Sequence, residues 1–119
     1  MNHECTMYLT MDYLAKKWTM LILLELGKGE HRWKRFSELK DSMGDVTPKM
    51  LSERLRDLER EGLVAHRVDA SSFPARSEYG LTEPGRELVD AVRQIKAWAL
   101  KWKVSNEACR AQDCSRCLL

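Results

Sequence analysis

The residues best suited to chemistry in this sequence are four cysteines, three of which lie close together near its end. Cys109, Cys114 and Cys117 are separated by four and then two residues, a spacing at which thiolates can share one soft metal centre. The same spacing matches three ligands of a plant-type ferredoxin cluster, which needs a fourth cysteine. Cys5 is the candidate for that ligand, and His3 is the alternative. The sequence therefore predicts a zinc or iron–sulfur site.

Two other interpretations of the cysteines stay open. In one, the thiols form disulfides as a redox switch; in the other, they are incidental parts of an inert tail. No secretory signal is visible, and no apolar run approaches the roughly 20 residues of a membrane helix. We therefore expect a cytoplasmic protein with no membrane association. A reducing compartment favours metal ligands or redox thiols over a structural disulfide framework.

No arrangement typical of a catalytic site stands out. The histidines, His3, His31 and His66, lack the spacing of a catalytic or metal-binding pair, and we expect them to be solvated or packed. A glycine-rich phosphate loop, a Ser/His/Asp order and paired carboxylates are missing from the sequence. Trp33 lies among basic residues in a polar loop, where packing is a simpler role than ligand contact. The sequence does not predict an enzyme.

The composition fits one small domain. The chain has 119 residues, of which 44% are hydrophobic and 32% are charged, enough for a small core. Its net charge of +2 is too small to indicate nucleic-acid binding by bulk electrostatics, so such binding must depend on where the basic residues lie. We expect a domain over residues 1–105 and a cysteine-bearing tail over residues 106–119.

The element around which the chain is organised is a predicted helix over residues 47–62. Thr47 is suited to the N-cap, Pro48 to the first helical position and Gly62 to the C-terminal end. The apolar face consists of Leu51, Leu55 and Leu58. The opposite, mostly basic face consists of Lys49, Ser52, Glu53, Arg56 and Arg60. Such a face suits the major groove of DNA, although a solvated face laced with charge pairs has the same pattern.

The segments before this helix predict a helix-turn-helix. Helices are expected over residues 7–16 and 18–26. Phe36 and Ser37 resemble a hydrophobic entry and an N-cap for a short helix over residues 38–43. A tight turn then leads into the capped second helix, which completes the motif.

The segments after it predict a wing. Residues 64–69 and 77–81 alternate apolar and polar side chains, and a turn with Pro74 joins them. A β-hairpin attached to a helix-turn-helix is a winged helix. Residues 27–35, by contrast, are expected to form a polar loop.

Thr82 is suited to cap a last helix over residues 83–104. Its apolar positions have near-heptad spacing and are Leu88, Val92, Ile95, Ala99 and Trp102. This stripe indicates a dimer interface, with packing against its own domain as the alternative. The predicted fold class is α+β, mainly α: a winged helix-turn-helix with a β-hairpin wing and a long C-terminal dimerisation helix.

Together these segments resemble the HxlR-type winged-helix transcriptional regulators, relatives of the MarR group. The matching pieces lie in order and include Lys17-Trp18, Arg35-Phe36-Ser37-Glu38-Leu39, Pro48-Lys49-Met50-Leu51-Ser52-Glu53-Arg54-Leu55, Leu58-Glu59-Arg60-Glu61-Gly62-Leu63-Val64, Glu78-Tyr79 and Leu81-Thr82. The resemblance implies homodimers that bind palindromic operators through the recognition helix and the wing. In some members of the family, the N-terminal cysteine that Cys5 matches senses oxidants or electrophiles.

The sequence departs from the family pattern in three places. Ala15-Lys16 stands where the family often has a glycine pair. The loop over residues 27–35 looks a few residues longer than usual, and the tail carries three cysteines that the pattern does not require.

We therefore expect a homodimeric DNA-binding transcription regulator that responds to redox state or metal through its cysteines. The residues expected at base edges are Lys49, Ser52, Glu53 and Arg56. The residues expected at phosphates are Thr47, Arg54, Arg60, Arg67 and Arg76. The redox-sensing residue is Cys5, and the metal ligands are Cys5, Cys109, Cys114 and Cys117. The alternative is a metal or iron–sulfur redox protein that uses the winged helix as an interaction scaffold.

Overall fold

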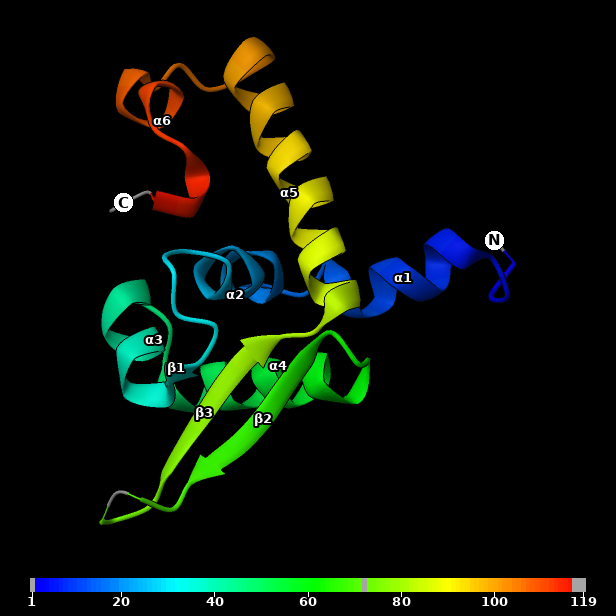
Figure 1. Ribbon diagram of the computed structural model, residues 1–119. Coiled ribbons are helices and arrows are strands. Elements are labelled where there is room, and N and C mark those ends of the chain that lie inside the picture. The colour runs from blue at the N-terminus through cyan, green and yellow to red at the C-terminus, as the bar shows by residue number, and fades with distance from the viewer. Residues whose placement is uncertain (1, 72, 117–119) are drawn as a thin grey trace.

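The structure, a computed structural model, describes residues 2–71 and 73–116. Its elements in chain order are α1 (Thr6–Leu14), α2 (Thr19–Leu26), β1 (Lys34–Arg35), α3 (Phe36–Met43), α4 (Pro48–Arg60), β2 (Val64–Asp69), β3 (Arg76–Leu81), α5 (Glu83–Trp102), α6 (Glu107–Ala111) and a 3₁₀ turn (Cys114–Arg116). In the sheet, β3 lies between β1 and β2, and both pairings are antiparallel. The β2–β3 wing extends to one end of the molecule, and α5 rises toward the other (Figure 1).

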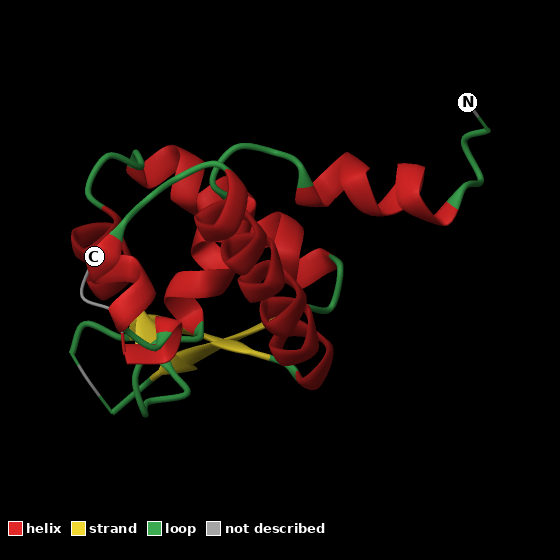
Figure 2. Ribbon diagram, turned by 90° about the horizontal axis from the view of Figure 1, so that it is seen from above, coloured by secondary structure: helices red, strands yellow, loops and turns green. Residues whose placement is uncertain are grey.

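The first helix stands apart from the core. Figure 2 shows α1 extending away from the rest of the molecule, and only Leu14 of this helix is buried. The helix ends at Leu14 instead of residue 16, and the chain reaches α2 through Trp18, which has a φ of 79°. No helix of the described part is long and apolar enough to cross a membrane.

Leucines of α2, α3 and α4 form the centre of the core. Leu23 of α2 and Leu39 of α3 are 0% and 1% exposed. The predicted apolar face of α4 is confirmed, because no surface is left exposed on Leu51, Leu55 and Leu58. Burying one such side chain contributes about 1.5–3 kcal/mol, so this face fixes how α4 lies on the domain.

The predicted ends of α4 are also confirmed. The Thr47 hydroxyl oxygen accepts a hydrogen bond from the Met50 amide at 3.1 Å. At the other end, Gly62 has a φ of 76°, and the amides of Gly62 and Leu63 each donate to carbonyls of the last turn at 3.0 Å. This Schellman pattern needs the left-handed conformation that glycine adopts without strain.

The loop predicted over residues 27–35 contains a strand that the sequence analysis missed. Strand β1 pairs with β3 and keeps Arg35 extended, at φ −76° and ψ 151°. Helix α3 can therefore begin at Phe36, with Arg35 in the N-cap position. The predicted N-cap at Ser37 is wrong, because Ser37 already lies inside the helix.

Lys34 ties this strand to the end of α2. Its Nζ donates to the carbonyl oxygen of Leu26 at 3.1 Å and to that of Lys28. Burial lowers the pKa of Lys34, and the carboxylates of Glu25 and Glu38 oppose that shift. Carbonyls at a helix C-terminus lack partners within the helix and attract a cation, so the lysine holds the loop in place.

The start of α5 is fixed against the turn that follows α4. The Thr82 hydroxyl donates to the Gly62 carbonyl at 2.7 Å and accepts from the Gly85 amide at 3.2 Å. The predicted N-cap of α5 at Thr82 is therefore confirmed. The Thr82 amide donates to the Leu63 carbonyl at 3.1 Å. A Cβ at Gly85 would lie 2.1 Å from the same Leu63 oxygen, so only glycine fits this contact.

We expect Gly85→Ala to lower the free energy of unfolding by about 1–3 kcal/mol or more, because the added methyl group overlaps the Leu63 carbonyl. In a helix without this contact, the same change would raise stability by about 0.5–1 kcal/mol through helix propensity. Urea denaturation measures the sign directly. A stabilised Gly85→Ala variant would contradict the contact.

Candidate nucleic-acid interface

The predicted base-reading residues lie on one side of α4. Lys49, Ser52, Glu53 and Arg56 follow one another at steps of three, one and three residues, which places them on a shared helical face. Lys49 and Arg56 are exposed, and neither forms an ion pair with another described residue. Ser52 and Glu53 are half-buried beside them. The face therefore presents two long cations with unused donors.

Asp57 organises the other cations of α4. Its Oδ2 lies 2.6 Å from Nη1 of Arg54 and 3.6 Å from Nζ of Lys16, and its Oδ1 lies 3.4 Å from Nη1 of Arg60. The Arg54 side chain is only 15% exposed, whereas that of Arg60 is 66% exposed. Arg60 is therefore open to an external anion, and a phosphate at Arg54 would have to compete with Asp57.

The base of the wing is held by a cation–aromatic stack. The Arg67 guanidinium lies 4.3 Å from the centroid of the Trp33 ring, and its Nε donates to Glu78 at 3.0 Å. Trp33 can approach β3 because Gly80 has no side chain; a Cβ there would lie 3.2 Å from the indole ring. The packing role expected for Trp33 is confirmed, and Arg67 is oriented by partners on both sides.

A second stack lies within the wing, and one of its rings contacts α4. The rings of His66 and Tyr79 lie 4.5 Å apart across β2 and β3, and Nδ1 of His66 is 3.8 Å from Oε2 of Glu59. Burial raises the pKa of the Tyr79 hydroxyl, the Glu59 carboxylate adds to this effect, and Arg56 opposes it. His66 is therefore a packed histidine, as expected. The Arg56 that faces outward is electrostatically linked to the wing.

The wing also carries exposed groups. Arg76 begins β3, is exposed, and shares a shallow hollow with Arg35 and Phe36. Arg35 is a basic residue that the sequence analysis left out, because the loop was not expected to join the sheet. Phe73, in the turn between the strands, is fully exposed.

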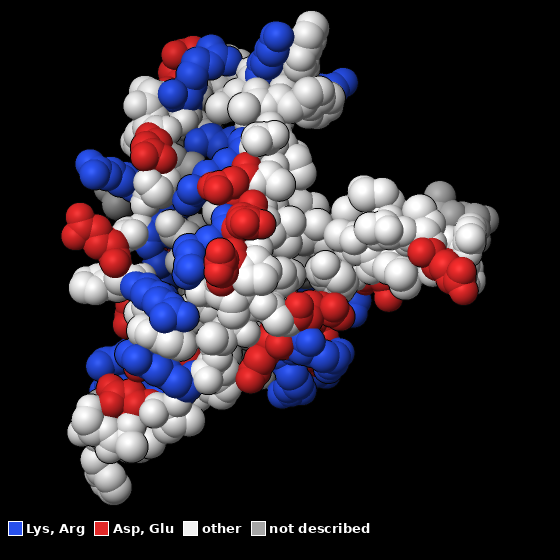
Figure 3. Space-filling model, turned by 45° about the vertical axis from the view of Figure 1, so that its right-hand side comes forward, with Lys and Arg blue, Asp and Glu red and all other residues white. Residues whose placement is uncertain are grey.

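No single basic patch dominates the face in Figure 3, where Lys and Arg side chains lie interspersed with Asp and Glu. This agrees with the net charge of +2. An interface with DNA therefore depends on the few exposed cations of α4 and the wing. The roles of all nine predicted DNA-contacting residues stay predictions.

The cysteines lie at two separate places. Cys5 precedes α1, and Cys109 lies in α6. Both are half-buried free thiols. Helices α1 and α6 lie on opposite sides of α5 (Figures 1 and 2). A site that joins Cys5 to the tail in this arrangement needs the tail of a second chain. Among the side chains that the structure describes, which do not include that of Cys114, no group of three His, Cys, Asp or Glu residues is placed to hold a metal ion. Cys117 and the side chain of Cys114 lie outside what the structure describes, so the predicted metal site stays a prediction.

The comparisons with known proteins agree with this geometry. Residues 13–107 match the family model described as HxlR-like helix-turn-helix. The chain belongs to this family. One relative is an uncharacterized HTH-type transcriptional regulator of Bacillus subtilis (strain 168), YvaP, which is 38% identical over 92 residues, 77% of this chain and 82% of that protein.

Solved structures of the family have the same fold. The reduced form of the transcriptional regulator YodB from B. subtilis has a TM-score of 0.71 and 31% identity, over 87% of this chain and 98% of that one. The redox regulator HypR in its oxidized form has a TM-score of 0.72 and 33% identity, over 84% and 99% of the two chains. The predicted family and winged-helix fold are confirmed. The chain is a transcriptional regulator of this helix-turn-helix type and, as the sequence predicted, not an enzyme.

Proposed function

We propose that this transcriptional regulator binds a palindromic operator as a homodimer, with one α4 helix in each of two major-groove half-sites. The observation that carries the proposal is the exposed pair Lys49 and Arg56, which have no ion-pair partner among the described residues. They lie on the face of α4 opposite its buried leucines. Because its proposed target is chromosomal DNA, we propose that the regulator is cytoplasmic.

The residues of α4 divide into two roles. Arg56 and Lys49 suit the acceptor edge of guanine, and Glu53 suits the amino group of cytosine. Arg60 and the wing Arg76 are exposed and suit phosphates. Arg54 and Arg67 are the other arginines proposed for phosphates, and each has a carboxylate partner that fixes its position. Thr47, which caps α4 by accepting from the Met50 amide, is proposed to lie at a phosphate.

We expect Arg56→Ala to cost about 1–3 kcal/mol on the preferred operator and to relax specificity at one base pair. Arg76→Ala should instead weaken binding to all sequences and lower the salt slope by about one. Fluorescence anisotropy at several salt concentrations, on operator and random duplexes, measures both effects. Lys103→Ala is the matched control, because Lys103 follows α5 and is distant in sequence from α4 and the wing. Equal losses on both duplexes for Arg56→Ala would refute a base-reading role.

The proposed dimer rests on exposed apolar side chains of α1 and α5. The predicted stripe of α5 divides in two: Val92 is 5% exposed and packs within its own domain, whereas Ile95 and Trp102 are 53% and 64% exposed. Met7 and Leu9 of the projecting α1 are 60% and 55% exposed. Large exposed apolar side chains on two helices indicate an interface, and a second copy of the chain offers the same surface.

We expect Ile95→Glu to convert the dimer to monomer. An unpaired charge buried in an interface costs about 2–5 kcal/mol, so the dimer dissociation constant should rise by about 30-fold or more. Sedimentation equilibrium measures the change, and Gln94→Glu, at the neighbouring exposed position, adds the same charge outside the stripe. An unchanged dimer with Ile95→Glu would remove this face from the interface.

We further propose that the cysteines make the regulator responsive to oxidants or metal. Two of the similar solved structures are the redox regulator HypR in its oxidized form and the reduced form of YodB, and this similarity supports the proposal. In the thiol version, a peroxide oxidises the Cys5 thiolate to a sulfenic acid, and a second thiol then displaces water to form a disulfide. In the metal version, Cys109, Cys114 and Cys117 bind zinc or an iron–sulfur cluster together with Cys5 of the second chain of the dimer.

One preparation separates these versions. Metal and acid-labile sulfide are measured on protein purified without oxygen, and DNA binding is then followed during peroxide addition for the wild type and Cys5→Ser. The thiol version predicts a metal-free protein whose binding falls with peroxide only when Cys5 is present. Stoichiometric zinc or iron would favour the metal version, and a metal-free protein insensitive to peroxide would refute both.

A further inference from the structure

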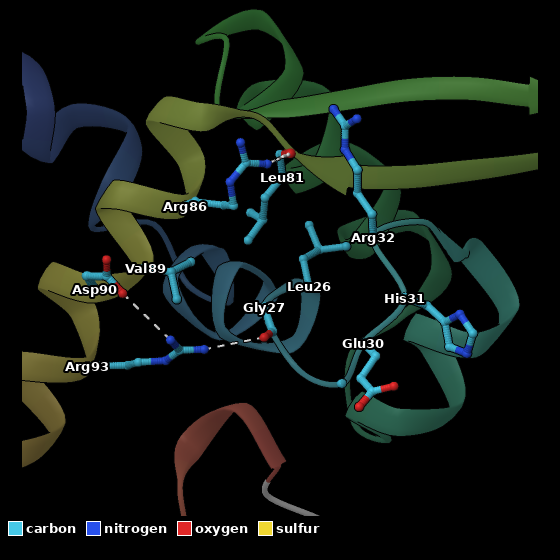
Figure 4. Close-up of a pocket in the computed structure, with 11 residues that line it drawn as sticks. Leu26, Gly27, Glu30, His31, Arg32, Leu81, Arg86, Val89, Asp90 and Arg93 are labelled. Carbon is cyan, nitrogen blue, oxygen red and sulfur yellow. Dashed lines mark hydrogen bonds and ion pairs between the residues drawn. The ribbon is translucent and has the colours of Figure 1, made fainter.

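A cavity of about 410 Å³ lies between the loop after α2, the end of β3 and the first turns of α5 (Figure 4). Its apolar part is formed by Leu26, Leu81 and Val89. The charged side chains that line it are Arg32, Arg86, Arg93, Glu30 and Asp90. The volume falls in the range of about 300–1,000 Å³ that is usual for small-molecule sites.

The arginines around this cavity retain unused hydrogen-bond donors. Arg86 donates to the Leu81 carbonyl at 3.2 Å, and Arg32 lies over the Trp33 ring; neither forms an ion pair with a carboxylate of the described residues. A guanidinium has five N–H donors, so most of the donors of both side chains are free for a ligand.

Arg93 is the deepest of the three. Its Nη2 donates to the Gly27 carbonyl at 3.3 Å, and its Nη1 lies 3.6 Å from Asp90, whose side chain is 74% exposed. Its Nε is buried and has no hydrogen-bond partner among the described residues. A buried donor without a partner costs about 1–3 kcal/mol, so the Arg93 guanidinium is held beside the cavity with its hydrogen-bonding capacity incompletely used.

Part of the cavity wall comes from the loop over residues 27–35, which the sequence led us to expect to be longer than the family pattern. Gly29 and His31 belong to the long loop, and the Gly29 amide donates to the Ser115 carbonyl of the tail at 2.7 Å. Hydrogen bonds from Ser115 lower the pKa of Asp113, and Arg93 lowers it further, so the tail lies near the rim. The long loop and the tail therefore meet at this cavity.

We propose that the cavity binds a small monocarboxylate with a compact apolar body. The carboxylate accepts hydrogen bonds from Arg93, because a guanidinium matches the two oxygens of a carboxylate. The Arg86 guanidinium, directed toward the Leu81 carbonyl beyond Val89 (Figure 4), adds positive charge to the same cavity. The body of the ligand covers Leu26, Leu81 and Val89, which a hydrated inorganic anion would leave exposed to water. This site lies apart from the DNA-facing side of α4, and its occupation does not depend on the function proposed above.

Isothermal titration and thermal unfolding of the full chain without DNA test the proposal. The probes are benzoate and cyclohexanecarboxylate. The controls are neutral benzamide, which lacks the negative charge, and inorganic phosphate, which lacks the apolar body. We expect saturable binding of both carboxylates and a rise in Tm, with at least tenfold weaker binding of benzamide and phosphate. No saturation by about 10 mM carboxylate, a concentration that corresponds to negligible affinity, would overturn the proposal. Equal binding of benzamide or phosphate would overturn it as well.

Variants and NMR spectra locate the site. Arg93→Gln should weaken benzoate binding about tenfold or more, because a charge-assisted hydrogen bond contributes about 1.5–3 kcal/mol. Arg93→Lys, which keeps the charge but not the planar pair of donors, serves if Arg93→Gln unfolds, and Lys17→Gln, outside the lining, should bind as the wild type does. In ¹H–¹⁵N spectra the amide signals of Gly27 and Gly29 should shift with benzoate. Undiminished affinity in the arginine variants, or shifts confined to other residues, would refute this location.

Discussion

The structure depends on the contact between the turn after α4 and the first turn of α5. The carbonyls of Gly62 and Leu63 accept from the hydroxyl and the amide of Thr82, and Gly85 lies against the same Leu63 carbonyl. Four elements meet there, because α4 ends, β2 begins, β3 ends and α5 begins within a few residues of this contact. The recognition helix, the wing and the helix proposed for dimerisation are therefore fixed relative to one another. DNA recognition by a dimer needs such rigidity, because the separation of two half-sites is set by the helical repeat of DNA.

A second set of contacts joins the loop after α2 to this frame. Lys34 binds the carbonyls at the end of α2, and Trp33 lies under the Arg67 guanidinium at the base of the wing. The loop thus becomes the third strand of the sheet and one wall of the cavity next to α5. A ligand, or a change in the tail that contacts Gly29, would act on the wing through this loop. The same loop therefore lines the cavity and contacts the base of the wing.

Local signals explain what the sequence could predict. The ends of α4 follow from Thr47, Pro48 and Gly62, and its buried face follows from leucines at helical spacing, so both were predicted correctly. Strand β1 is only two residues long and has no periodicity of its own. Its existence depends on pairing with β3, which is more than forty residues away in the sequence. The error at Ser37 has the same origin, because long-range pairing overrode a local capping signal.

The candidate site shows the same division. Exposure of Lys49 and Arg56 follows from the helical face, and it was predictable. The carboxylate partners of Arg54 and Arg67 were not, because Asp57 and Glu78 attach to them through geometry that spacing alone does not reveal. The cavity at Arg93 also has no sequence signature, since its walls come from three segments that are distant in the chain.

The most direct test of the account is hydroxyl-radical footprinting of the protein on a duplex selected from a random pool. Two recognition helices held by one dimer should protect two tracts on the same face of the DNA, centred about 10–10.5 base pairs apart and related by a dyad in the selected sequence. The wings should extend each tract outward. A single protected tract, or a selected sequence without a dyad, would contradict the proposal that this chain reads DNA as a symmetric dimer.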